Sequence, residues 1–167
     1  MTNQLTYEQF SAEAAKLMPQ NAFMTTAYGG KTNTMTIGWG SVGIMWRKPV
    51  FTAMVRQSRY TKELVEQSNE FTITLPLADM KEALALCGSK SGRDLDKIAA
   101  AKLTLAAGQS ISTPVIAAPG LQLECKVLFK ETMTPANLDS TTKNSCYADG
   151  DYHTLYFGEI VAAYKIE

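Results

Sequence analysis

The feature that most constrains the fold is a repeated alternation of apolar and polar residues in short segments bounded by turn residues. In residues 70–76, EFTITLP, the apolar side chains are Phe71, Ile73 and Leu75, and threonines fill the positions between them. Residues 121–131, LQLECKVLFKE, alternate in the same way. This period of two residues is that of a β-strand, because successive side chains of a strand point to opposite faces. The chain is therefore predicted to be mainly β.

Further segments add strands to this pattern. Residues 21–40 predict two strands about a turn at Gly29 and Gly30, because glycine adopts the positive φ that a tight hairpin needs. The other strand candidates are SVGIMWRKP (41–49), VFTAMVR (50–56) and HTLYFGEIVAAYKIE (153–167). Pro49 is expected between two of them, because proline fits poorly in a central strand. Many short strands with glycine-marked turns predict a closed or nearly closed antiparallel barrel with helices at its periphery.

The N-terminal residues 1–20 are predicted to form a helical segment that packs on the barrel. Thr6 and Gln9 match a capping box, and the apolar residues that follow recur on one helical face. The segment does not fit a signal peptide, because it contains acidic residues and lacks a long apolar core. The length of 167 residues suits one domain spanning 1–167.

Three shorter helices are predicted between the strands, each from a local capping pattern. Their expected caps are Ser58 or Thr61, the capping box of Asp79 and Glu82 with Gly88 at the helix end, and Asp94. Asp149 and Asp151, in the segment ADGDYH, are interpreted as turn residues.

Composition excludes several classes of function. Sixteen basic residues balance sixteen acidic ones, which argues against nucleic-acid binding and against a polybasic membrane patch. No apolar run is long enough to span a membrane. Cys87, Cys125 and Cys146 are odd in number and lack short paired spacing, which predicts free thiols in a cytoplasmic protein rather than disulfides. With His153 as the single histidine, no metal site is expected.

The segment VRQSRYT, residues 55–61, is a candidate anion site. It places Arg56, Ser58, Arg59 and Thr61 between a strand and a helix start. A helix N-terminus already favours an anion, and arginine and hydroxyl groups bind phosphate well. The alternative is that both arginines are solvated or pair with Glu63 and Glu66.

A second loop before a helix, GSKSGRDLDK (88–97), offers Arg93 and Lys97 beside a glycine. Taken alone, an ordinary helix entry explains it as well. It is not a Walker loop, because the GKS or GKT ending of such a loop is absent.

The segment NTMTIGWGSVGIMW (33–46) is rich in glycine, threonine, methionine and tryptophan. Glycine weakens the interior of a strand unless the backbone must come close to another group. A flat heteroaromatic ring would fit along such a wall. A bulged barrel strand with its tryptophan in the core is the alternative.

Taken together, these segments resemble the flavin reductase-like family, the FMN-binding split barrels that include flavoredoxin. The segments stand in the family's order as NTMTIGWGSVGIMWRKP, VRQSRYTKELVEQSNEFTI, CGSKSGRDLDK, LECKV and HTLYFGEI. The resemblance spans roughly Ala22 to Ile166. It implies a six-stranded antiparallel Greek-key split barrel, an FMN cofactor and a homodimer. The segment 131–152 matches no motif of the family.

The resemblance also assigns residues to the cofactor. It places the FMN phosphate at Arg56, Ser58, Arg59, Tyr60 and Thr61. It places the isoalloxazine ring along Met35, Thr36, Trp39, Gly40, Ser41 and Val42. A loop that closes on the cofactor maps to Ser91, Gly92, Arg93, Asp94 and Lys97. His153 is expected to face the flavin as a catalytic residue that orders a donor or supplies a proton at neutral pH.

Three functions are consistent with this resemblance. The leading one is an oxidoreductase that transfers hydride from NADH or NADPH to FMN and passes electrons to an acceptor. The second is a flavoredoxin-like electron carrier that a protein partner reduces. The third is a split barrel that binds a flavin without turnover. Cys87 is expected to be a buried small hydrophobe.

Overall fold

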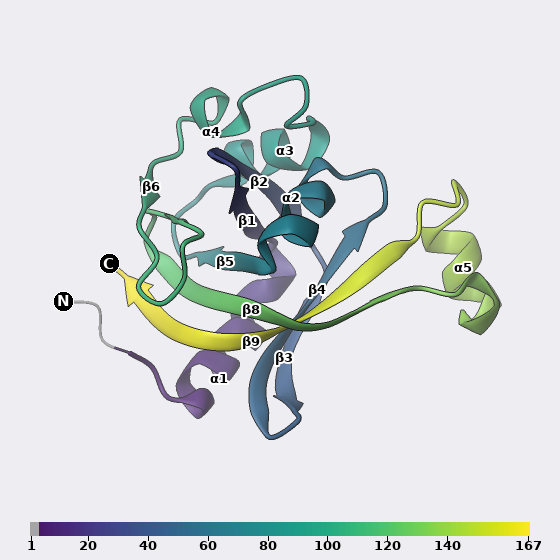
Figure 1. The fold of residues 1–167 in the computed structure, drawn as a ribbon, viewed down its shortest axis with the longest axis horizontal. Helices are drawn as coiled ribbons and strands as arrows, with labels where there is room; N and C mark the ends of the chain where they lie inside the picture. The colour runs from purple at the N-terminus through teal and green to yellow at the C-terminus, as the bar shows by residue number, and fades with distance from the viewer. Residues whose placement is uncertain (1–3) are drawn as a thin grey trace.

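The structure is a computed structural model that describes residues 4–167, so residues 1–3 of the predicted N-terminal segment lie outside the described residues. It contains one antiparallel sheet of seven strands, in the order β2-β1-β5-β8-β9-β4-β3 (Figure 1). The strands are β1 Ala22–Tyr28, β2 Lys31–Ile37, β3 Gly40–Met45, β4 Lys48–Arg56, β5 Glu70–Pro76, β8 Gly120–Thr132 and β9 His153–Ile166. A small ribbon pairs β6 Leu105–Ala106 with β7 Val115–Ile116. The predicted mainly β, antiparallel architecture is confirmed, although the main sheet has seven strands rather than six.

The two edges of the sheet are adjacent in sequence. β2 and β3 lie at opposite ends of the hydrogen-bonded order, yet only Gly38 and Trp39 join them. The sheet must therefore curl until its edges approach each other at this link. Between residues 4 and 167, no ladder joins β2 to β3, so the barrel is split at this seam rather than closed.

Both hairpins at the start of the sheet depend on residues with positive φ. Gly29 and Gly30 have φ of 58° and 77°, as the predicted turn requires. Trp46 and Arg47 form the turn between β3 and β4 with φ of 52° and 62°. Pro49 was expected between two strands but lies within β4, where it pairs with β3. Proline is tolerated there because the ladder between β4 and β9 begins one residue later.

The helices are α1 Tyr7–Leu17, α2 Tyr60–Ser68, α3 Lys81–Ser89, α4 Lys97–Ala100 and α5 Ser140–Cys146, with 3-10 turns η1 Met18–Gln20 and η2 Pro135–Asn137. α1 begins with the predicted capping box of Thr6 and Gln9. Its buried face, formed by Phe10, Ala14 and Leu17, joins the main hydrophobic core of the sheet. The helix therefore packs on the barrel as predicted. No helix in the described chain is both long and apolar enough to cross a membrane.

The other predicted caps are wrong. Arg59 occupies the cap position of α2, and no side chain caps that helix. Ser58 is unavailable because its hydroxyl donates to Asp151, and the Thr61 hydroxyl instead accepts a hydrogen bond from Asn33.

The acidic residues near α3 and α4 also act differently from the prediction. Met80 takes the cap position of α3, with the Asp79 carboxylate accepting from the Lys81 amide, and the helix runs past Gly88. α4 is capped by Asp96, whose carboxylate accepts from the amides of residues 98 and 99, and not by Asp94.

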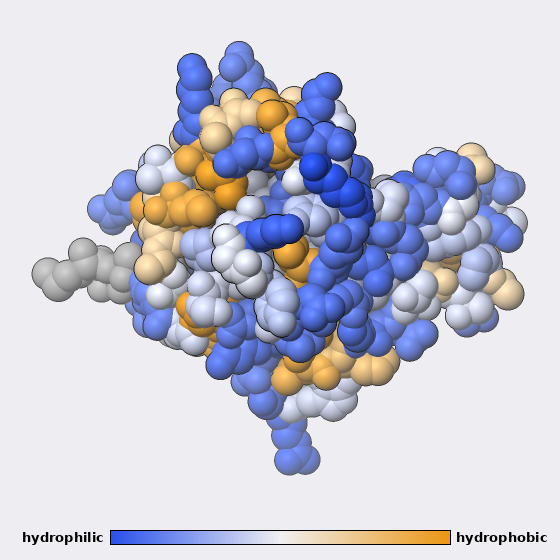
Figure 2. All heavy atoms as spheres, turned by 45° about the horizontal axis from the view of Figure 1, so that its top comes forward, coloured by the Kyte–Doolittle hydropathy of each residue, from blue (hydrophilic) through white to orange (hydrophobic). Residues whose placement is uncertain are grey.

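The core lies inside the curled sheet. The alternating residues Phe71, Ile73 and Leu75 are fully buried there. Thr72 and Thr74, on the opposite face of the same strand, are also buried. The Thr72 hydroxyl donates to the Pro114 carbonyl, and the Thr74 hydroxyl donates to the side chain of Gln122 on β8. The β6–β7 region and α3 cover this outer face. Where Figure 2 views the surface, hydrophilic residues predominate and apolar patches are scattered among them.

β8 and β9 extend beyond the rest of the sheet and carry an arm formed by residues 133–152 (Figure 1). The arm contains η2 and α5 and projects away from the helices that cover the barrel. Its return loop leads into His153, which pairs with Arg56 at the end of β4. This register places the return loop beside the predicted anion-binding turn.

Candidate functional site

A cavity of about 170 Å³ opens at the seam of the split barrel. It is lined by Met35, Thr36, Ile37, Gly38, Trp39, Met54, Arg56, Arg59 and His153. We call it the Trp39 cavity. Three chain segments meet here: the end of β2 with its link to β3, the end of β4 with the following turn, and the start of β9. Six predicted site residues, Met35, Thr36, Trp39, Arg56, Arg59 and His153, are thereby brought together.

A second cavity, of about 200 Å³, adjoins the start of α2 and is called the Ser91 cavity. It is lined by Met35, Ser58, Arg59, Tyr60, Thr61, Ser89, Lys90, Ser91, Gly92, Arg93 and Lys97. The two separate motifs around Arg59 and Ser91 therefore face one space. Met35 and Arg59 line both cavities, so these two residues connect the predicted ring wall with the predicted phosphate site.

The remaining predicted residues lie in neighbouring hollows. Gly40, Ser41 and Val42 line a space of about 540 Å³ between β3 and α1, on the other side of Trp39. Asp94 lines a hollow of about 650 Å³ that also includes residues of the loop 92–97 and of β2. These four residues are therefore near the two cavities but do not line them.

Arg59 has its positive charge available at the junction of the two cavities. One guanidinium nitrogen donates to the Gly88 carbonyl at 3.1 Å. Within residues 4–167 no carboxylate forms an ion pair with it. A guanidinium has five N–H donors, so most of those on Arg59 are free for an anion.

Arg56 is bound to the arm instead. Its guanidinium donates to the carbonyls of Asp151 at 2.8 Å and Cys146 at 2.9 Å, and forms an ion pair with Asp149 at 3.4 Å. The predicted alternative, pairing with Glu63 and Glu66, is wrong. Each of those glutamates pairs with other cations, which are Arg93 for the first and Lys62 and Lys130 for the second.

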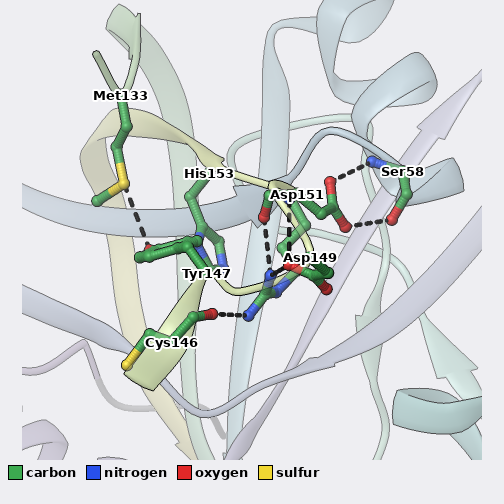
Figure 3. A network of polar contacts seen from close by, with 8 residues as sticks. Ser58, Met133, Cys146, Tyr147, Asp149, Asp151 and His153 are labelled. Atoms are coloured by element: carbon green, nitrogen blue, oxygen red, sulfur yellow. Dashed lines mark hydrogen bonds and ion pairs between the residues drawn. The ribbon is translucent and has the colours of Figure 1, made fainter. Parts of the chain in front are cut away.

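The return loop of the arm also binds the anion-site turn (Figure 3). The Asp151 carboxylate accepts hydrogen bonds from the amide and the hydroxyl of Ser58. Asp149 and Asp151 are turn residues, as interpreted, since Gly150 between them has φ of 74°. Their contacts with Arg56 and Ser58 were missed. The only sequence signal is the presence of two acids immediately before the strand that pairs with Arg56.

His153 is 7% exposed and lies beside the Trp39 ring, with 5.3 Å between ring centroids. Its Nδ1 atom is 2.7 Å from the Tyr147 hydroxyl. Burial, reinforced by the positive charge of Arg56, lowers the pKa of His153 to about 4. The imidazole is therefore neutral at pH 7. In this state it can donate or accept a hydrogen bond, but it does not carry the extra proton that the predicted role as a proton donor at neutral pH requires.

Lys97, which lines the Ser91 cavity, contacts Cys87. Lys97 is 4% exposed, and its ammonium donates to the Cys87 carbonyl at 3.0 Å. Burial lowers the pKa of Lys97 and raises the pKa of the Cys87 thiol. Cys87 is fully buried among apolar side chains, so the prediction of a buried small hydrophobe is confirmed.

The sheet is antiparallel and curled, and it is split at a seam lined by Trp39 and by Arg59, which has no carboxylate partner among residues 4–167. This architecture is that of the split-barrel proteins. The family model described as flavin reductase like domain matches residues 15–167. The chain therefore belongs to the flavin reductase-like family, and the resemblance seen in its sequence is confirmed.

Individual proteins and solved structures are also similar to this chain. An uncharacterized protein of Archaeoglobus fulgidus is 28% identical over 145 residues, which are 87% of this chain and 72% of that protein. The flavoredoxin of Methanosarcina acetivorans has a similar structure, with a TM-score of 0.68 and 26% identity over 88% of this chain and 68% of that one. An FMN-binding domain from Shewanella baltica shares the fold at 19% identity, with a TM-score of 0.72 over 99% and 78% of the two chains.

Proposed function

We propose that this protein is a cytoplasmic FMN-binding oxidoreductase of the flavin reductase type, which takes hydride from NADH or NADPH and passes electrons to an acceptor. The observation that carries the proposal is the position of Arg59. It has no carboxylate partner in the described chain and lines both the Trp39 cavity and the Ser91 cavity. An arginine in this state is suited to a phosphate group.

The residues around the two cavities fit the parts of FMN. On the phosphate side, the Ser91 cavity offers hydroxyl and amide donors together with Arg59 and the buried Lys97. On the ring side, the Trp39 cavity offers the flat indole of Trp39 together with Met35 and Thr36. Bound FMN would supply the hydride and electron transfer chemistry, and the protein would supply binding and orientation.

The protein's own groups have separable tasks in this proposal. Arg59 would hold the phosphate, and Trp39 would shield one side of the ring from water. The Thr36 hydroxyl already donates its hydrogen to the Leu84 carbonyl at 2.7 Å, which fixes the position of α3 against β2. Its oxygen could therefore only accept a hydrogen bond from a ligand. His153 would offer a neutral imidazole to a group in the cavity.

A flavoredoxin-like electron carrier is the second candidate function, and the 26% identity with the flavoredoxin of Methanosarcina acetivorans favours it. In that function FMN remains bound and a redox protein, rather than a nicotinamide, delivers electrons. A flavin-binding barrel without turnover is the third. These three functions require the same cavities, so they differ in reactivity and not in FMN affinity.

We also propose that the protein works as a homodimer. Trp46 is 59% exposed, and its ring forms a surface cluster with Phe129 and Phe157, with ring centroids 5.6 to 6.2 Å apart. A cluster of exposed aromatic residues is typical of protein–protein contacts. Sedimentation of the wild type and of Trp46→Ser tests this, and a monomeric wild type would refute it.

The test of function is an anaerobic visible spectrum of the purified protein with FMN, recorded before and after addition of NADH or NADPH. Retained flavin absorbance that disappears with one nicotinamide supports the reductase and identifies the donor. Retained absorbance that responds only to a reduced redox protein supports the carrier. Failure to retain FMN would refute the proposal. Riboflavin serves as the matched ligand without phosphate and should bind much more weakly.

A further inference from the structure

Tyr147 and His153 form a buried pair beside the Trp39 cavity. Tyr147 is 4% and His153 is 7% exposed. Tyr147 is the C-cap residue that follows α5 in the arm, and His153 begins β9. Figure 3 shows the tyrosine between Met133 and His153, both of which contact its hydroxyl. The tyrosine comes from the segment 131–152, in which the sequence offered no motif.

The hydrogen atoms of this pair can be assigned from its contacts. The Tyr147 oxygen lies 2.7 Å from His153 Nδ1 and 3.3 Å from the Met133 sulfur. A tyrosine has one O–H to donate, and a thioether sulfur is a weak acceptor whereas an imidazole nitrogen is a good one. The short distance to Nδ1 is also typical of an O–H donor. The hydroxyl therefore donates to Nδ1, and the proton of the neutral ring lies on Nε2.

The surroundings hold both rings in place. The Arg56 guanidinium lies over the Tyr147 ring at 5.2 Å, and the Tyr152 ring stacks on it at 5.1 Å. The His153 carbonyl accepts a hydrogen bond from the Met133 amide at 3.0 Å. The arm that binds Arg56 and Ser58 thus also places the Tyr147 hydroxyl next to His153.

We propose that Tyr147 is a positioning residue that holds His153 in the tautomer with its proton on Nε2, so that His153 presents a hydrogen-bond donor to the Trp39 cavity. Nε2 makes no hydrogen bond with any other residue that the structure describes. A molecule next to His153 would therefore present an acceptor, such as a carbonyl oxygen or an unprotonated ring nitrogen. Only the identity of that molecule, a flavin or a nicotinamide, rests on the proposed function.

The single histidine makes a direct test possible. Long-range ¹H–¹⁵N correlation spectra of the full chain, labelled with ¹⁵N-histidine and free of ligand at pH 7, report only His153. We expect an unprotonated Nδ1 and a protonated Nε2. A protonated Nδ1, or averaged signals from both tautomers, would overturn the proposal. Because no cofactor is present, this result does not depend on the proposed function.

Two variants separate positioning from general packing. Tyr147→Phe removes the hydroxyl that binds His153, and we expect it to shift the signals toward a mixture of tautomers. Tyr152→Phe is the matched control, because its hydroxyl forms no hydrogen bond with other described residues, and we expect no shift. A tyrosine-to-phenylalanine change at 147 that leaves a pure Nε2–H signal would overturn the role of Tyr147.

Binding of FMN gives an independent second readout. Tyr147→Phe should weaken FMN binding about fivefold, the effect of one neutral hydrogen bond, whereas Tyr152→Phe should not. Equal affinities in the wild type and Tyr147→Phe would overturn the role of the Nε2–H group toward the ligand. If the wild type binds no FMN, the proposed function fails, and the ligand-free spectra still decide the tautomer.

Discussion

Asp151 holds Ser58 through two hydrogen bonds, at 3.1 Å from the Ser58 amide and 2.6 Å from its hydroxyl. A phosphate oxygen would require the same two donors, so the carboxylate competes with any anion at this turn. We expect Asp151→Ala to bind FMN several-fold more tightly, because the change frees both donors and removes a negative charge. The Asp151 carbonyl still accepts from Arg56 in this variant, so the arm stays anchored.

Fluorescence titration of FMN into the wild type and Asp151→Ala measures this effect. Asp79→Ala removes another aspartate side chain, at a site remote from the two cavities, and should leave the affinity unchanged. Weaker binding in Asp151→Ala would mean that Asp151 supports the site instead of competing for it.

Arg59 and Arg93 both line the Ser91 cavity but differ in their partners. Arg59 has no carboxylate partner in the part of the chain that the structure describes, whereas Arg93 forms an ion pair with Glu63. We expect Arg59→Ala to weaken FMN binding by about 2 kcal/mol, or roughly 30-fold, the value of a hydrogen bond to a charged group. Arg93→Ala should have a smaller effect, because its charge is already compensated. Isothermal titration of both variants measures the difference, and a larger loss in Arg93→Ala would move the phosphate toward the loop.

Features that depend on residues close together in the sequence were predicted correctly, whereas features that depend on distant residues were not. Alternation within β5 and the glycine turn after β1 are local patterns, and both were predicted correctly. The choice between Asp94 and Asp96 as the cap of α4 is not local, because either acid satisfies the capping rule. Burial of Lys97, the first residue of α4, at 4% exposure fixes where that helix begins.

In the candidate site, too, only the residues that are close together in the sequence could be predicted. Residues near one another in sequence, such as Ser58 and Arg59, were identified by their types and spacing. The contacts of Asp151 and Tyr147 with β4 and β9 depend on how the arm folds back across the end of the sheet. No periodicity or motif encodes that path, so the arm's part in the site could be found only in three dimensions.

The buried His153 predicts a pH dependence of stability. Its pKa in the folded protein is about 4, below its ordinary value of 6.5, so protonation favours the unfolded state. The contribution is fully present above pH 6.5 and is lost as the pH falls from 6.5 toward 4. Between pH 7.5 and 4.5, we expect this histidine to reduce the free energy of unfolding by about 2 kcal/mol.

Urea unfolding at several pH values, compared with His153→Gln, isolates this contribution because the variant lacks the titrating group. The acidic groups with lowered pKa, such as Glu66 at about 2, titrate mainly below this range and are common to both proteins. Parallel pH profiles for the two proteins would contradict the low pKa of His153.

Glu124 predicts a large effect on stability that is separate from the site. Its side chain is fully buried, and its carboxylate accepts hydrogen bonds from the amides of Gln109, Ser110 and Ile111 and from the Tyr164 hydroxyl. Glu124→Ala leaves these donors without their acceptor in the interior, so we expect the free energy of unfolding to fall by about 3 kcal/mol or more. Tyr164→Phe removes one donor and should cost only about 1 kcal/mol. Equal losses in the two variants, measured by urea unfolding at pH 7, would show that the carboxylate does not hold the loop 109–111 against β8.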